Sequence, residues 1–106
     1  MDFSEIKLKI INFDHELRRK NIRPDIILLF GSHAKGTAKK DSDIDLAVVS
    51  RDFGKNRLKE GILLNKILYK LFPEAEAIPI SLKDFFDKEN VSPILSEIKK
   101  TGIPIL

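Results

Sequence analysis

The sequence of 106 residues contains no cysteine and no tryptophan. Without cysteine the chain has no disulfide bond, no thiolate metal site and no cysteine nucleophile. It has only two histidines, so a structural zinc site is not expected either. No apolar run approaches the roughly 20 residues that span a bilayer, and the first residues lack the cationic and apolar layout of a signal peptide. We therefore expect a cytoplasmic protein that does not enter a membrane.

The overall composition is that of a globular protein. Apolar residues make up 42% of the chain and charged residues 33%, which argues against disorder. A chain of this length builds one core, so we expect a single domain over residues 1–106. The net charge of +3 suits a negatively charged ligand such as a triphosphate and leaves binding of RNA open.

The apolar pattern predicts an α/β fold with a small mixed β-sheet and helices mainly on one face. In the first helix, residues 3–19, the apolar side chains recur every three or four residues, as in an amphipathic helix. The predicted strands cover 25–30, 43–49 and 75–80, and Pro79 indicates that the third is short or lies at an edge. Further predicted elements are a short helical turn and loop over 32–40, a helix over 57–71, a turn capped by Ser81, a last helix that begins near Ser92 and Pro93, and a final edge strand over 103–106.

The same pattern assigns a core to these elements. In the second helix it predicts a buried face formed by Leu58, Ile62, Leu64, Leu68 and Leu71. In the last helix it predicts burial of Ile94, Leu95 and Ile98, and it favours core positions for Phe85 and Phe86.

The residues with chemical potential lie between the first two predicted strands. Asp43 and Asp45 are two apart, so in a strand both carboxylates would project to one side. Two adjacent carboxylates repel each other, and a divalent cation would remove that cost. Gly31 and Ser32 follow the first strand, where free backbone N–H groups and a hydroxyl could bind a phosphate. The combination predicts a magnesium and triphosphate site suited to phosphoryl or nucleotidyl transfer.

A third carboxylate would complete a site for two metal ions. Glu76 is the preferred candidate because it lies at the start of the third predicted strand, and Glu74 is the alternative. Lys35, Lys39, Lys40 and His33 surround the motif, and for them a solvated loop is the favoured interpretation.

Gly31-Ser32, ten intervening residues and Asp43-Ile44-Asp45 resemble the signature of the DNA polymerase beta-like nucleotidyltransferases, and Gly36, Ser42 and Leu46 match its extended form. In size the chain resembles the minimal nucleotidyltransferases. The resemblance implies that Gly31, Ser32 and Ser42 bind the nucleotide, and that Asp43, Asp45 and Glu76 are the catalytic and metal-binding residues. It implies two Mg²⁺ ions, replaceable by Mn²⁺, with ATP or another nucleoside triphosphate as donor. One departure is the glutamate at position 76, where the family usually has aspartate.

Families of this size resemble the antitoxin of HEPN toxin–antitoxin pairs. The resemblance implies transfer of AMP from ATP to a tyrosine hydroxyl of a partner HEPN toxin. Two alternatives stay open: a subunit that neutralises its partner by binding alone, and transfer to a small molecule or RNA. The sequence also leaves homo-oligomerisation open.

Overall fold

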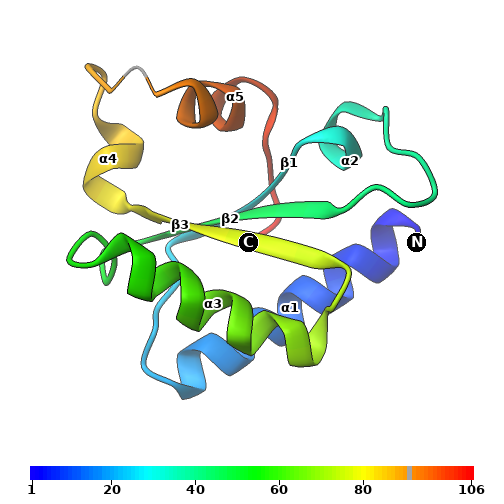
Figure 1. The fold of residues 1–106 in the computed structure, drawn as a ribbon, viewed down its shortest axis with the longest axis horizontal. Coiled ribbons are helices and arrows are strands. Elements are labelled where there is room, and N and C mark those ends of the chain that lie inside the picture. The colour runs from blue at the N-terminus through cyan, green and yellow to red at the C-terminus, as the bar shows by residue number, and fades with distance from the viewer. Residues whose placement is uncertain (91) are drawn as a thin grey trace.

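A computed structural model describes residues 1–90 and 92–106 (Figure 1). Its centre is a four-stranded mixed sheet with the strand order β3-β2-β1-β4. β1 (Ile26–Phe30) pairs antiparallel with both β2 (Ile44–Ser50) and β4 (Ile103–Pro104). β3 (Ala75–Ser81) runs parallel to β2 and forms the opposite edge of the sheet. The small mixed sheet and both predicted edge strands are thereby confirmed, although β3 is seven residues long.

The two long helices cover one face of the sheet, as Figure 1 shows. α1 (Phe3–Arg19) begins after Asp2, whose side chain accepts a hydrogen bond from the Glu5 N–H at 2.9 Å. α3 (Arg57–Leu71) begins after Asn56, which caps it in the same way. Their apolar faces meet the inward side chains of β1 and β2 in the larger of two core clusters, which includes Ile10, Phe13, Leu17, Leu29, Leu46, Leu64, Leu68 and Phe72. This arrangement confirms that the helices lie mainly on one face.

The shorter elements cover the other face. α4 (Leu82–Phe86) is capped by Ser81, whose hydroxyl accepts the Asp84 N–H. α5 (Pro93–Thr101) buries Leu95 and Ile98 against the sheet. The second core cluster forms there from Leu28, Phe30, Ala47, Val49, Ile80, Leu95 and Ile98. α2 (Ser32–Lys35) is a single turn between β1 and β2. Within the described residues, no helix has the length and hydropathy needed to cross a membrane.

The outer edge of β3 is closed by a side chain of α3. The Asn65 amide donates to the Ala77 carbonyl and accepts from the Ala77 N–H, both at 2.8 Å. The backbone of Ala77 therefore points away from β2, and that of Pro79, two residues on, points the same way. The N–H that proline lacks is accordingly not needed by the sheet, which explains why Pro79 is tolerated at this edge.

Several predicted core positions are wrong. Leu58 and Ile62 are 74% and 60% exposed, and Leu71 also lies at the surface, because α3 is rotated so that Leu64, Ile67 and Leu68 face the core. Ile94 is exposed because α5 packs through Leu95 and Ile98 only. Phe86 is 65% exposed, since the five-residue helix α4 contacts the second cluster through Leu82 and Phe85.

Candidate functional site

Asp45 and Glu76 lie side by side on neighbouring strands. They are partners in the parallel register of β2 and β3. Asp45 is two residues before Ala47, and Glu76 is two residues before Ile78, which packs against the same cluster as Ala47. Because alternate residues of a strand point to the same face, both carboxylates project on the side of the sheet that α5 covers. Glu74 precedes β3, and its carbonyl accepts the Ile44 N–H at 3.1 Å.

Asp43 was predicted to be the first residue of the second strand, but it lies one position before β2. Asp43 is exposed, whereas Asp45 is partly buried. Partial burial raises the pKa of the Asp45 carboxyl, and the charges of Glu76, Asp43 and Glu97 raise it further, while His33 opposes the shift. The structure thus gathers negative charge around Asp45.

Gly31 lies directly against the Asp45 carboxylate. Its φ of 74° belongs to the region that favours glycine, and a β-carbon at this position would collide with Asp45 Oδ2. α2 begins at the next residue, and Gly36, in the left-handed conformation, ends it. This turn holds Ser32 just after the carboxyl end of β1, beside the start of β2.

The loop between α2 and β2 is fixed by its own polar groups. Nε2 of His33 lies 3.1 Å from the Ser42 carbonyl, which can only accept, so this nitrogen carries the proton. The Ser42 hydroxyl accepts the Lys39 N–H at 2.8 Å. Ser42 and His33 therefore hold the shape of the loop that leads into Asp43. This role of His33 was not predictable from the sequence, because the contact depends on how the loop folds back.

Glu97 of α5 adds a fourth carboxylate to the group of Asp43, Asp45 and Glu76, and it was not among the predicted site residues. Its Oε1 forms an ion pair with Lys35 Nζ of α2 at 2.7 Å. The two residues are 62 positions apart in the chain. Only the packing of α5 on the sheet brings them together, so no local sequence signal identifies Glu97.

The donor set suits a hard divalent cation. In the described part of the chain, none of the ion pairs involves Asp43, Asp45 or Glu76. No group of three or more His, Asp or Glu side chains among those residues is arranged to hold a metal ion by itself. Magnesium usually takes one or two protein carboxylates and completes its shell with phosphate and water oxygens. Asp43 and Asp45 fit that requirement.

Comparison with known proteins places these features in a family. Residues 9–106 match the model described as "Polymerase beta, Nucleotidyltransferase". A solved toxin–antitoxin structure with AMP-PNP is 26% identical, with a TM-score of 0.57, over 94% of this chain and 72% of that one. A mutant form of the toxin–antitoxin pair MntA–HpeT is 24% identical, with a TM-score of 0.62 and the same coverage, and it supports the fold. Curated proteins give no match. Because the family model covers most of its length, the chain belongs to the polymerase beta nucleotidyltransferase family.

Proposed function

We propose that the chain transfers AMP from ATP to a tyrosine hydroxyl of a partner HEPN toxin and that this transfer depends on magnesium. The observation that carries the proposal is the set of carboxylates, Asp43, Asp45 and Glu76, without ion-pair partners among the described residues. They lie next to a glycine turn, in a chain of the nucleotidyltransferase family.

Each site residue has a role in this proposal. Gly31 lets the triphosphate approach the backbone, and Ser32 adds a hydroxyl donor, while Ser42 shapes the loop beside the nucleotide. Asp43 and Asp45 would hold Mg²⁺, and Glu76 would complete a second site together with substrate oxygens. When bound, the cation would neutralise charge on the triphosphate and on these carboxylates.

The reaction is a displacement at the α-phosphorus. The acceptor oxygen forms a bond to that phosphorus, and the bond between it and the α–β bridging oxygen breaks, which releases pyrophosphate. The proton of the acceptor hydroxyl passes to a base, and Glu76 is the residue that we assign to this role. An exposed carboxylate on the edge strand is accessible to a hydroxyl that arrives from another protein.

The choice of partner and nucleotide has separate support. Two of the solved structures that the chain resembles are toxin–antitoxin structures, and one of them was solved with AMP-PNP. The more identical of the two is the nucleotide complex. A toxin as acceptor and an adenine nucleotide as donor are therefore the choices that we test first.

Calorimetry with ATP, in the presence and absence of Mg²⁺, tests the nucleotide site. We expect Mg²⁺-dependent binding that Asp43→Asn and Asp45→Asn each weaken strongly. Lys40→Ala, in the exposed loop, is the matched control and should bind nearly as well as the unaltered chain. Equal binding with and without the cation would refute the proposed metal ligands.

The third carboxylate is tested by transfer rather than by binding. Glu76→Gln should lower the rate of AMP transfer by about 10²–10⁴-fold, as expected for a base, and leave ATP binding largely intact. Glu74→Gln is the control, because Glu74 lies outside β3. The opposite ranking would assign the role to Glu74.

Mass spectrometry of a helical HEPN partner tests the acceptor. After incubation with ATP and Mg²⁺, one tyrosine should carry AMP, and the variant with both Asp43→Ala and Asp45→Ala should add none. If that variant neutralises the toxin as well as the unaltered chain, and no AMP is added by either, the protein acts by binding alone.

A further inference from the structure

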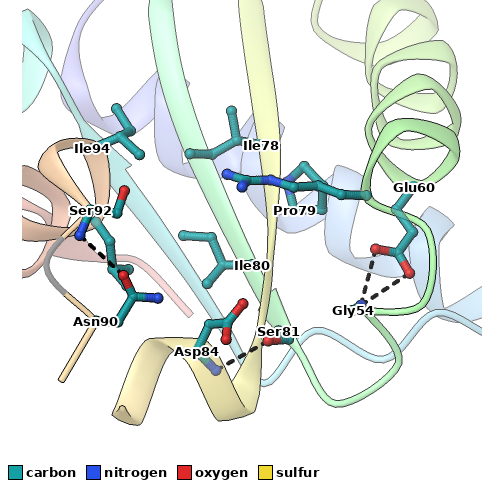
Figure 2. A pocket seen from close by; sticks show the side chains of 12 residues that line it. Gly54, Glu60, Ile78, Pro79, Ile80, Ser81, Asp84, Asn90, Ser92 and Ile94 are labelled. Atoms are coloured by element: carbon teal, nitrogen blue, oxygen red, sulfur yellow. Dashed lines mark hydrogen bonds between the residues drawn. The ribbon is translucent and has the colours of Figure 1, made fainter. Parts of the chain in front are cut away.

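A pocket of 160 Å³ lies along β3 on the same face of the sheet as Glu76. Figure 2 shows Ile78 and Ile80 of β3 on one side and Ile94 of α5 across from them. Leu95 completes the apolar wall. The rest of the lining is largely polar and includes Arg57, Glu60, Ser81, Asp84, Asn90 and Ser92. We refer to this space as the edge pocket.

The edge pocket lies further along β3 than Glu76. Ile78, on its wall, is two residues beyond Glu76 and projects to the same face. At about 3.3 Å per residue, the two α-carbons are about 7 Å apart. A group seated against Ile78 can therefore place an atom beside the Glu76 carboxylate.

The sheet order gives the direction from which an acceptor must arrive. Gly31 and Ser32 follow β1, Asp45 is in β2, and Glu76 is in β3, the edge strand. Attacking and leaving oxygens lie roughly in line in such displacements. If the leaving phosphates lie at Gly31–Ser32, the attacking hydroxyl comes from the β3 side, where the edge pocket opens. This step rests on the proposed function.

The size and chemistry of the pocket select an occupant. A cavity of about 150 Å³ lined by aliphatic side chains is large enough to bind benzene. A volume of 160 Å³ thus matches the size of one aromatic ring, which the three isoleucines and the leucine would contact on one side, whereas the polar side of the pocket suits a ring that carries a hydroxyl. We propose that the edge pocket binds the phenol ring of the acceptor tyrosine and directs its hydroxyl towards Glu76.

Methyl NMR of the free chain tests the pocket without relying on catalysis, with 4-methylphenol as the probe of the tyrosine side chain. The Ile78, Ile80 and Ile94 methyl signals should shift as 4-methylphenol is added, while the Ile10 signal, from the opposite core, should not. ATP with Mg²⁺ should instead shift the amide signals of Gly31 and Asp45. If ATP moves the three pocket methyls and 4-methylphenol does not, the pocket is a nucleoside site and the proposal is wrong.

A substitution that fills the edge pocket provides a second test. Ile94→Trp should abolish the response of Ile78 and Ile80 to 4-methylphenol and lower AMP transfer to N-acetyl-tyrosinamide at least about tenfold, a loss of about 1.4 kcal/mol. Leu8→Trp is the matched control, since Leu8 is exposed on α1, away from the pocket. An unchanged response in Ile94→Trp would overturn the proposal. If no AMP is transferred by any form, the proposed function fails, whereas the 4-methylphenol response still decides the pocket.

Discussion

Gly31 and Asp45 occupy adjoining space so closely that position 31 has no room for a β-carbon. The carbon would collide with Asp45 Oδ2 and lie 3.2 Å from its Cγ. The glycine at the end of β1 therefore allows the turn and also leaves room for the carboxylate on β2. This contact links the turn that we propose binds phosphate to the carboxylate that we assign to the metal.

Gly31→Ala should be more destabilising than Gly36→Ala. Gly36, with φ 74° and ψ 17°, is in the left-handed helical region, where a residue with a β-carbon costs about 1–2 kcal/mol. Gly31, with φ 74° and ψ −154°, is in a region that is essentially confined to glycine, so its backbone cost is higher. A β-carbon at Gly36 would have no neighbour within 4 Å, whereas at Gly31 it meets Asp45. Urea denaturation of the two variants measures the difference, which combines the higher backbone cost at Gly31 with that collision. Equal losses of unfolding free energy would contradict the close approach.

Asp45→Asn should raise the melting temperature of the nucleotide-free chain and abolish Mg²⁺-dependent ATP binding. Burial and the charges of Glu76, Asp43 and Glu97 raise the pKa of Asp45, so its ionised form is disfavoured in the folded chain. The neutral amide removes that repulsion. Asp41→Asn, in the exposed loop, is the control for a general charge effect. Calorimetric scans without divalent cations measure the difference, and a lower melting temperature for Asp45→Asn would contradict it.

Local patterns predicted the segments well, because helix periodicity and turn residues act over a few positions. The bounds of α1 and α3 agree with the prediction, and the predicted strand over 43–49 shifts by one residue. The face that α3 buries was not predictable in this way. Leu64 and Leu68 are buried as predicted, but Leu58 and Ile62, which have the same spacing, are exposed. Ile67 was not predicted to be buried, because only the packing of α3 against α1 and β3 turns it inward.

In the candidate site, too, some residues were predictable from local spacing, whereas others depend on how distant segments pack. Asp43 and Asp45 were identifiable because their spacing within one strand fixes how they project. Glu76 was preferred from its position at the start of the third predicted strand, but its pairing with Asp45 depends on the parallel register of β2 and β3. Glu97 and its partner Lys35 required the position of α5, which no pattern within either segment encodes.

Asn65→Leu should destabilise the chain by about 1–3 kcal/mol, the cost of leaving buried polar groups without partners. The Asn65 amide satisfies both backbone groups of Ala77, the residue after Glu76. Loosening this edge should also slow transfer while ATP binding persists. Asn12→Leu, on the exposed side of α1, is the matched control and should unfold at nearly the urea concentration of the unaltered chain. If the two variants are equally stable, the amide contributes nothing to the edge.

The ion pair of Lys35 and Glu97 yields a test of how α5 supports the nucleotide site. Both side chains are more than a third exposed, so the pair contributes at most about 1 kcal/mol to stability. Its effect on the site is expected to matter more, because an unpaired Glu97 adds to the negative charge around Asp45. Lys35→Glu should therefore weaken ATP binding by about fivefold, the equivalent of about 1 kcal/mol. It should also loosen the contact between α2 and α5.

The exchange of both charges, Lys35→Glu with Glu97→Lys, restores the pair with reversed polarity and keeps the local net charge. We expect calorimetry to show that the exchange recovers most of the lost affinity, whereas Lys39→Glu in the neighbouring loop serves as a control for lost positive charge alone. Recovery by the exchange would mean that the pair itself positions α2 against α5. If the exchanged chain binds ATP no better than Lys35→Glu, Lys35 acts on the triphosphate directly, and the bridge to Glu97 has no part in the site.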